Sequence, residues 1–383
     1  MRKYIVIPDS FKGTLSSIEV CRIAEKKILE QDPGCRVAAI PVADGGEGTV
    51  DCFLAAGKWK RVGVKVRGPY GEPSQACYAK LNEKAVIELA QAAGLPQVEG
   101  RENPALTTTY GVGMMIRDAL RQGCREIVIG LGGSCTNDGG CGLAGALGAK
   151  FYDADGRAFL PVGGSLDRIA RIDISEMDQR LKECRITAMC DIDNPMYGPE
   201  GAACVFAPQK GAGSGMVQML DRNLRCLARR FREDLGKAVD ELPGAGAAGA
   251  AGAGIAAFLG GELKPGIQMV LDLVEFDREL EDADLVITGE GRLDSQSVRG
   301  KVIAGVAGRA AARHVPVAAV VGSIGEGAEK IYEAGVTAIF SINRQPVDFS
   351  VSRGQSAENL AAAVENLIRF RLAFAGEYEK KDA

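Results

Sequence analysis

Short apolar runs alternate with amphipathic segments and small polar loops at the beginning of the chain. Residues 3–8 form an apolar run that predicts a β-strand, and residues 17–31 carry apolar side chains at helical spacing, with Ser16 or Ser17 as the expected cap. A second strand is expected over 35–42. This strand–helix–strand order predicts a parallel βαβ unit, in which functional loops follow the carboxyl ends of the strands.

The middle of the chain follows a different pattern. From about residue 60 apolar and polar residues alternate with period two, and a turn is expected at 68–73, which together indicate a hairpin or meander. Residues 201–208 (GAACVFAP) predict a further strand, and residues 216–239 predict a long amphipathic helix. The middle therefore predicts a mixed α/β region.

Near residue 277 the strand–helix rhythm of the N-terminus returns and continues to a closing helix. We therefore expect an α/β fold with two α/β domains. A discontinuous, Rossmann-like doubly wound domain would be built from residues 1–62 and 277–383, and a mixed α/β domain, residues 63–276, would be inserted into it. The active site is expected in the cleft between the two domains, where the loops would gather.

Composition and charge exclude several classes of protein. The chain has 383 residues, of which 46% are hydrophobic and 25% charged, and its formal net charge of −4 is ordinary for a soluble globular protein. We expect no nucleic-acid partner because a basic excess is lacking, and no membrane partner because no apolar run has the length that spans a bilayer. The N-terminus is expected to form a first strand rather than a signal peptide.

Cysteine and histidine usage narrows the chemistry further. Eleven cysteines occur without a C-x-x-C pair, which predicts free thiols and a reducing, cytoplasmic location. His314 is the only histidine, which excludes His-rich zinc sites and argues against Ser-His-Asp or Cys-His catalysis. His314 is predicted only to end a helix. Any catalysis is therefore expected to use Asp, Glu, Lys, Arg and backbone groups.

Five loops share one composition, namely small residues with one or two charges at the end of an apolar strand. Turns use the same residues, but the repeated carboxylates go beyond what turns require. Phosphoryl transfer needs backbone N–H groups for phosphate, carboxylates for Mg²⁺ and for a proton, and cations for developing charge. The loops are residues 8–13 (PDSFKG), 43–49 (ADGGEGT), 130–140 (GLGGSCTNDGG), 190–195 (CDIDNP) and 288–297 (TGEGRLDSQS).

Residues 243–254 (PGAGAAGAAGAG) match the spacing of a dinucleotide fingerprint, G-x-G-x-x-G. Such a fingerprint follows a strand and opens a helix, whereas here a long helix is expected before it. We therefore expect close packing of small residues, or a loop lining the cleft, rather than an NAD(P) site. The sequence contains no G-x-x-x-x-G-K-[ST] motif, which excludes the P-loop NTPases.

In their order along the chain, the five loops and their flanking residues resemble the bacterial glycerate kinase family, the class without a P-loop. The resemblance extends from Lys3 to about Ala375 and departs at 246–254, where a GAAGG-like run would be expected. It implies two α/β domains and transfer of the γ-phosphoryl group of ATP to D-glycerate with Mg²⁺. The implied product is 2-phosphoglycerate. The alternatives are 3-phosphoglycerate, or phosphorylation of another small hydroxy acid.

Candidate roles follow from the chemistry of glycerate, which offers a carboxylate and two hydroxyls. A cation should hold the carboxylate, and a protein carboxylate should accept the proton of the attacking hydroxyl. Asp191 and Asp193 lie two apart, so an extended segment would turn both toward one metal ion, although Asp193 could form an Asx-turn instead. The predicted catalytic residues are Lys12, Asp44 and Asp191, with Asp44 as the first choice for the base.

The remaining candidates divide by ligand. The residues predicted to bind the acid are Asp9, Ser10, Arg292, Asp294 and Lys301. The residues predicted to bind the metal ion are Asp191, Asp193 and Glu290. The residues predicted to bind the nucleotide phosphates are Gly132, Gly133, Ser134, Thr136, Asn137 and Asp138.

Two other classes of function stay open. One is a two-lobed module that binds an organic anion without chemistry, which Mg²⁺-dependent ATP consumption would exclude. The other is an NAD(P) dehydrogenase, which would change absorbance at the nicotinamide band. For the kinase, the expected partners are the small molecules D-glycerate and ATP, and the chain is expected to be a monomer or a homodimer.

Overall fold

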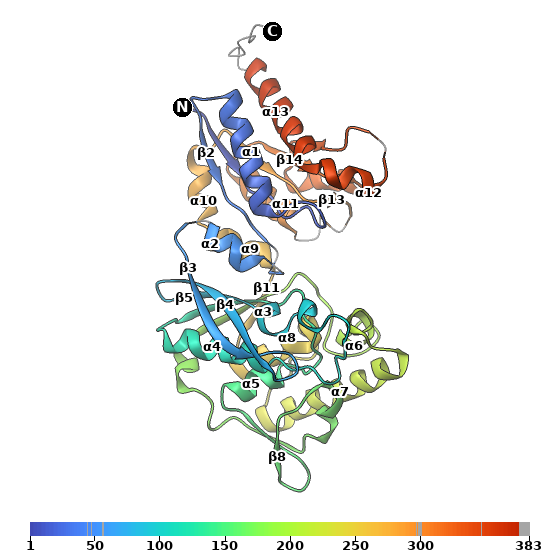
Figure 1. Ribbon diagram of the computed structural model, residues 1–383. Coiled ribbons are helices and arrows are strands. Elements are labelled where there is room, and N and C mark those ends of the chain that lie inside the picture. The colour runs from blue at the N-terminus through green and yellow to red at the C-terminus, as the bar shows by residue number, and fades with distance from the viewer. Residues whose placement is uncertain are drawn as a thin grey trace. The chain divides into compact units, whose positions relative to one another are not determined.

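The computed structural model describes residues 1–43, 45–46, 48–55, 57–295, 297, 301–345 and 347–374. Internal contacts divide the chain into two units, each built mainly from the elements labelled in Figure 1. Unit 1 contains residues 1–44, 55–57 and 267–383, and unit 2 contains 45–54 and 58–266. The domain boundaries at 62/63 and 276/277 stay a prediction from the sequence.

Unit 1 joins the N-terminal βαβ segment to the C-terminal third of the chain. Its strands are β1 (Lys3–Val6), β2 (Arg36–Ala39), β12 (Leu285–Thr288), β13 (Arg292–Leu293), β14 (Val317–Val321), β15 (Ser323–Ile324) and β16 (Ala338–Ser341). Its helices are α1 (Ser17–Gln31), α9 (Gly266–Leu273), α10 (Phe276–Glu279), α11 (Val302–Ala312), α12 (Phe349–Ser352) and α13 (Ser356–Phe374), with short 3₁₀ turns at Leu280–Asp282, Ala328–Ala334 and Arg353–Gln355.

The main sheet of unit 1 has five strands in the order β16-β14-β12-β1-β2, and every neighbouring pair is parallel. Counted within the unit, this is the doubly wound order 2-1-3-4-5. Side chains of α1 and α13 pack with those of alternate strand positions, such as Tyr4 and Val6, in one apolar cluster. Helix α11 contacts β12 and β14 through its own buried residues. The predicted α/β doubly wound architecture is confirmed.

Unit 2 holds the middle of the chain. Its strands are β3 (Lys60–Arg67), β4 (Pro73–Leu81), β5 (Lys84–Glu88), β6 (Glu126–Gly130), β7 (Lys150–Tyr152), β8 (Ala158–Phe159), β9 (Arg171–Asp173), β10 (Arg185–Met189) and β11 (Glu262–Lys264). Its helices are α2 (Thr49–Ala55, most of it), α3 (Ala90–Ala93), α4 (Tyr110–Arg121), α5 (Cys141–Ala146), α6 (Ala202–Phe206), α7 (Ser214–Leu235) and α8 (Ala247–Leu259), with 3₁₀ turns at Leu95–Val98, Gly163–Arg168, Gln179–Glu183 and Pro208–Lys210.

The main sheet of unit 2 has the order β11-β10-β6-β5-β4-β3. Strands β5, β6, β10 and β11 run parallel, and β3 and β4 form the predicted antiparallel meander with β5. The carboxyl ends of β6 and β10 therefore lie side by side, because Gly130 pairs with Met189. This places the loops that follow Gly130 and Met189 next to each other.

The structure decides three local predictions, two in unit 2 and one in unit 1. Residues 201–208 were expected to be a strand, but α6 occupies Ala202–Phe206; short apolar runs do not distinguish the two states, and the paired alanines favour a helix. The glycine-rich run forms α8, whose residues are all buried, as close packing of small residues requires. His314 follows α11 with φ 58° and terminates it.

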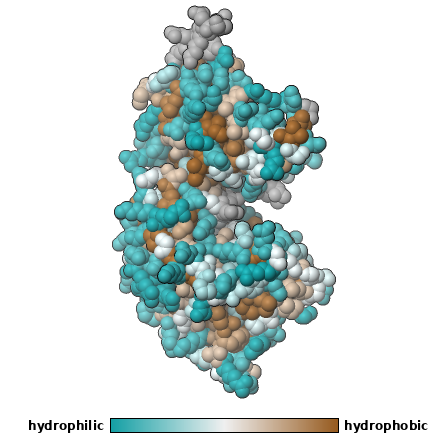
Figure 2. Space-filling model, viewed as in Figure 1, coloured by the Kyte–Doolittle hydropathy of each residue, from teal (hydrophilic) through white to brown (hydrophobic). Residues whose placement is uncertain are grey.

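The visible face of the molecule (Figure 2) is mostly hydrophilic, and the cysteines are free. Figure 2 shows hydrophilic residues over much of the visible face, with hydrophobic residues in smaller groups, one of them in the α12 region. Among the described residues no helix combines the length and the apolar character needed to cross a bilayer. All eleven cysteines are free.

The capping box of α1 generates a stability prediction. The Ser16 hydroxyl accepts from the Glu19 N–H at 3.2 Å, and the Glu19 carboxylate accepts from the Ser16 N–H at 2.8 Å. Ser16→Ala should lower the free energy of unfolding by about 1 kcal/mol, seen as a lower urea midpoint by circular dichroism. Ser214→Ala is the control, because Gly213 is the cap of α7 and the Ser214 side chain is exposed. Equal midpoints for the two variants would contradict the capping role.

Candidate active site

The loops after β1 and β12 meet at the point where the order of strands across the unit 1 sheet reverses. From β1 the chain goes first to β2 on one side and then to β12 on the other. The Asp9 N–H donates to the Gly289 carbonyl at 2.8 Å, and the Thr288 hydroxyl donates to the Ile7 carbonyl at 2.8 Å. In doubly wound sheets of order 2-1-3-4-5, ligands bind at this switch point, beyond the carboxyl ends of the strands. The fold therefore places Asp9 and Glu290 where a ligand is expected.

Ser17 holds the first loop against the strand ends. Its buried hydroxyl donates to the Pro8 carbonyl at 2.7 Å and accepts from the Val42 N–H at 2.9 Å. The loop itself closes tightly, since the Phe11 N–H donates to the Leu15 carbonyl at 2.8 Å. Lys12 lies in this turn and is exposed. The hydrogen bonds thus fix the backbone that carries Lys12.

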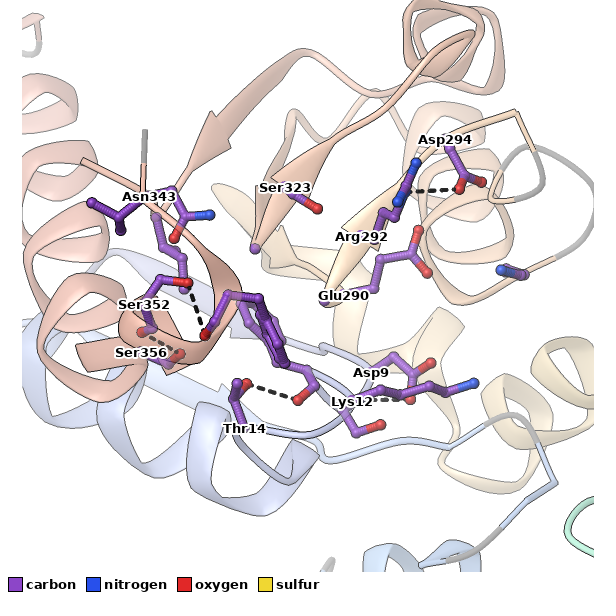
Figure 3. Close-up of a pocket in the computed structure, with 18 residues that line it drawn as sticks. Asp9, Lys12, Thr14, Glu290, Arg292, Asp294, Ser323, Asn343, Ser352 and Ser356 are labelled. Carbon is purple, nitrogen blue, oxygen red and sulfur yellow. Dashed lines mark hydrogen bonds and ion pairs between the residues drawn. The ribbon is translucent and has the colours of Figure 1, made fainter. Parts of the chain in front are cut away.

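A cavity of about 550 Å³ opens at these strand ends, and Figure 3 shows its lining. The charged side chains Asp9, Lys12, Glu290, Arg292 and Asp294 lie together on one side, and the hydroxyl and amide groups of Thr14, Asn343, Ser352 and Ser356 lie on the other. Seven residues singled out in the sequence line this cavity, namely Asp9, Ser10, Lys12, Glu290, Arg292, Asp294 and Lys301. The structure therefore brings together the candidates of the first and last loops.

Asp9 and Glu290 are the buried acids of this cavity among the described residues, and Glu290 is the less exposed of the two. Only 5% of it is exposed, and its Oε1 has no hydrogen-bond partner among the described residues. Burial raises the pKa of Glu290 and Asp294 adds to the increase, whereas a hydrogen bond from Ser297 and the charges of Lys301 and Lys12 oppose it. Glu290 lines the cavity, and a buried carboxylate oxygen without a partner suits a cation or a transferable proton.

Large apolar side chains also line the cavity. Phe349 and Val347 line it, although 60% of Phe349 and 43% of Val347 are exposed. The hydrophobic group over α12 in Figure 2 lies in this region. Large apolar side chains left open beside a polar pocket are typical of ligand-binding grooves.

The loop after β6 is held by backbone hydrogen bonds within unit 2. The Gly132 N–H donates to the Gly45 carbonyl at 3.2 Å, the Leu95 N–H to the Gly133 carbonyl at 2.9 Å, and the Cys135 N–H to the Ala93 carbonyl at 2.9 Å. Through these hydrogen bonds the loop is attached both to the α3 region and to the Gly-rich segment before α2. The loop is therefore a fixed surface rather than a free turn.

Asp138, near the end of this loop, is completely buried. Its carboxylate accepts from the Thr109 N–H at 2.8 Å, the Thr109 hydroxyl at 2.9 Å, and the N–H groups of Gly140 and Gly142 at 3.1 Å each. Burial raises the pKa of Asp138, while these hydrogen bonds lower it. Asp138 does not line a described cavity, and its oxygens already join α4 to the start of α5.

Thr136 and Asn137 are also buried without exposure. The Thr136 hydroxyl and both polar atoms of the Asn137 amide lack hydrogen-bond partners among the described residues. Gly249 packs directly against them: its φ is +65°, and a Cβ there would lie 2.0 Å from the Thr136 carbonyl oxygen. An unpaired buried amide costs about 1–3 kcal/mol per group, which marks this corner of unit 2 as unusual.

A second cavity, of about 200 Å³, lies where the loops after β6 and β10 meet. Gly132, Gly133 and Ser134 line it, together with apolar residues that include Met189 and Phe206. The charged residue of this lining is Lys210, which was not predicted from the sequence and belongs to FAPQKGA, residues 206–212. This segment has the small-residue and single-charge composition of the five loops, but it follows a helix rather than a strand.

The remaining candidates are distributed as follows. Asp191 and Asp193 are exposed in the loop after β10, and Asp191 accepts from the Gly266 N–H at 2.7 Å. Asp44 lies outside the described residues. Within the part of the chain that is described, no three His, Cys, Asp or Glu side chains form a metal-holding group. The predicted cleft between the domains stays a prediction.

Comparisons with known proteins agree with this fold and these loops. The profile of the Glycerate kinase family matches residues 4–372. The glycerate kinase of Bacillus cereus is 43% identical over 368 residues, covering 95% of this chain and 97% of that protein, and the glycerate 2-kinase of Escherichia coli K12 is 42% identical over 370 residues, covering 96% and 95%. A crystal structure assigned as glycerate kinase 2 from Salmonella typhimurium LT2 is 40% identical with a TM-score of 0.88, covering 98% and 99%.

The fold and the relatives together define the class: the chain is a kinase, a phosphotransferase with an alcohol group as acceptor. Family membership implies ATP as the donor and small molecules as substrates. The chain belongs to the glycerate kinase family. The resemblance noted from the five loops is confirmed.

The environment of Asp138 generates a test of its role. Asp138→Asn would turn an NH₂ group toward N–H donors and should lower the free energy of unfolding by about 2–4 kcal/mol. Thermal and urea unfolding measure the loss, and Asp167→Asn, at an exposed carboxylate of the same unit, should change it by less than about 0.5 kcal/mol. A variant that keeps full stability and loses only ATP affinity would favour the nucleotide contact predicted from the sequence.

Proposed function

We propose that the chain phosphorylates the 2-hydroxyl of D-glycerate, with ATP as donor and a requirement for Mg²⁺. The observation that carries the proposal is near full-length similarity to a protein named glycerate 2-kinase, 42% identical over 96% of this chain. The gathering of Lys12, Arg292, Glu290 and their neighbours around one cavity supports a phosphoryl-transfer chemistry.

The sizes of the two cavities suggest how the ligands divide. Pockets that enclose drug-sized molecules measure about 300–1,000 Å³. The unit 1 cavity, about 550 Å³, is within this range, and its lining includes apolar side chains for a base and cations for phosphates. The unit 2 cavity, about 200 Å³, is below it and suits a three-carbon acid. This division reverses the one expected from the sequence, which stays an alternative.

Three cations would act on the phosphates in the unit 1 cavity. Lys12, Arg292 and Lys301 line it, and Lys301 directly precedes α11, so that helix begins at the cavity wall. Lysine and arginine neutralise the charge that develops on the transferred group, and the first N–H groups of a helix favour anions. A carboxylate must take the proton of the attacking hydroxyl, and Asp44 stays the predicted base.

The residues present fit a magnesium ion. Mg²⁺ binds through one or two carboxylates, several waters and substrate phosphates, so it does not need a cluster of three protein ligands. Glu290 would hold it through the unpartnered Oε1, and Asp191 and Asp193 stay predicted ligands. When bound, the ion would neutralise phosphate oxygens.

We also propose a cytoplasmic location, because the eleven cysteines are free and thiols persist in reducing compartments. The monomer or homodimer expected from the sequence stays a prediction, as does the lack of nucleic-acid partners.

The reaction can be tested by phosphorus NMR of the product formed from D-glycerate and MgATP. Phosphate on the 2-oxygen couples to one carbon-bound proton and gives a doublet, whereas phosphate on the 3-oxygen couples to two and gives a triplet. We expect the doublet, no product with EDTA, and slower turnover of L-glycerate and glycolate. A triplet would assign the 3-hydroxyl, and faster turnover of glycolate would assign another acid.

Lys12 can be tested separately from folding. Lys12→Met should lower kcat/KM by about 100-fold or more, because a charge on the transferred group loses its partner. The melting temperature should stay within a few degrees, since Lys12 is exposed. Lys26→Met, at an exposed lysine of α1, is the matched control and should retain wild-type kinetics. Wild-type kinetics in Lys12→Met would remove Lys12 from the site.

A further inference from the structure

Among the lysines that the structure describes, two are almost fully buried, and their surroundings differ. Lys3 is 4% exposed, and its Nζ forms ion pairs with Asp282 at 2.6 Å and Glu279 at 3.1 Å. Lys210 is 2% exposed, and no ion pair to it occurs among the described residues. Buried ammonium groups that serve only structure are paired with carboxylates, as Lys3 is. Lys210 therefore needs another explanation.

The contacts of Lys210 leave part of its ammonium available. Nζ donates to the Ser134 hydroxyl at 2.8 Å and to the Thr136 carbonyl at 2.8 Å. An ammonium has three donors, so one remains after these two bonds, and Lys210 lines the unit 2 cavity. Gly132 and Gly133 line the same cavity and leave it open to a small ligand. The site thus presents a positive charge held by neutral oxygens.

The segments around Lys210 contain further features that cost folding free energy. Ala248, which lines the cavity, and the next two residues, Gly249 and Ala250, all have left-handed backbone angles. Left-handed alanines are strained, and such strain concentrates at ligand sites. The backbone of Thr136 and Asn137, whose side chains are unpaired, packs against the same segment. Strain, an unpaired hydroxyl, an unpaired amide and an ammonium without an ion pair, all in one place among the described residues, indicate function rather than stability.

We propose that Lys210, with the Ser134 hydroxyl beside it, binds an oxyanion of a substrate in the unit 2 cavity. The inference rests on the proposed function and adds a residue to it. The cavity of about 200 Å³ favours the carboxylate of the hydroxy acid as the source of the oxyanion. A phosphate of ATP has the same chemistry, and the two sources are distinguishable by kinetics.

Steady-state kinetics of Lys210→Met provide the first test. Loss of a charge-assisted hydrogen bond should raise the KM of one substrate by about 10- to 100-fold. A higher KM for D-glycerate identifies the carboxylate, and a higher KM for ATP identifies a phosphate. Lys237→Met, at an exposed lysine of unit 2, is the control and should leave both values unchanged. Unchanged KM values in a folded Lys210→Met protein would overturn the proposal.

The pH dependence of the wild-type enzyme provides a second test that needs no variant. Burial lowers the pKa of Lys210 to about 8, and the charges of Cys135 and Asp138 oppose this decrease. The two thiols here do not change charge near pH 8, because burial raises the pKa of Cys135 to about 12 and that of Cys190 to about 11. Burial also raises the pKa of the Asp138 carboxyl, which faces the same lysine. As pH rises through 8, Lys210 loses its proton, so kcat/KM for its ligand should fall about tenfold per pH unit.

Lys210→Arg separates this effect from other titrations. Arginine keeps its charge throughout the alkaline range, so the decrease above pH 8 should disappear in this variant. A decrease that persists in Lys210→Arg, or is missing in the wild type, would overturn the proposal. The NMR experiment reports the reaction of the wild-type enzyme independently, so failure of the lysine site would leave the proposed reaction intact.

Discussion

Close approach of backbone to backbone at the ends of the strands is the constraint on which both cavities depend. A Cβ on Gly322 would lie 2.3 Å from the Gly291 carbonyl oxygen in unit 1, and one on Gly130 would lie 2.3 Å from the Gly45 carbonyl oxygen in unit 2. Side chains do not tolerate such distances, so glycine is required where neighbouring loops touch. The packed loops exclude water, and this exclusion gives the buried charges their unusual properties.

Burial acts on the two central ionisable groups in opposite directions. It raises the pKa of Glu290 and lowers the pKa of Lys210 to about 8, because in each case the charged form loses hydration. A cation near Glu290 or an anion near Lys210 would return each pKa toward its ordinary value. By linkage, the same ligand would also stabilise the folded protein. Glu290 and Lys210, which lower the free energy of unfolding when no ligand is bound, are thus the groups through which a ligand of opposite charge would raise it most.

The sequence predicted what depends on short-range order. A cap at Ser16 or Ser17, the βαβ start and the meander after residue 60 follow from local periodicity and turn residues, and the five loops follow from composition; the structure assigns the cap to Ser16. The helix at 202–206 was missed because a short apolar run does not reveal its partners. The strand order, the burial of Asp138 and the two roles of Lys3 and Lys210 depend on contacts between distant segments. For that reason Lys210, which follows a helix, was missed.

In the glycine-rich run of α8, left-handed backbone angles are confined to residues 248–250. Of its three left-handed residues, Gly249 has no space for a side chain, because the Thr136 carbonyl lies where its Cβ would be. Ala248 and Ala250 adopt left-handed angles with methyl groups present, each at a cost of about 1–2 kcal/mol. Glycine at these positions would relieve the strain but would add about 0.5–1 kcal/mol of conformational entropy to be lost on folding, and would remove buried methyl contacts. The alanines therefore keep the cavity wall rigid at a small net cost.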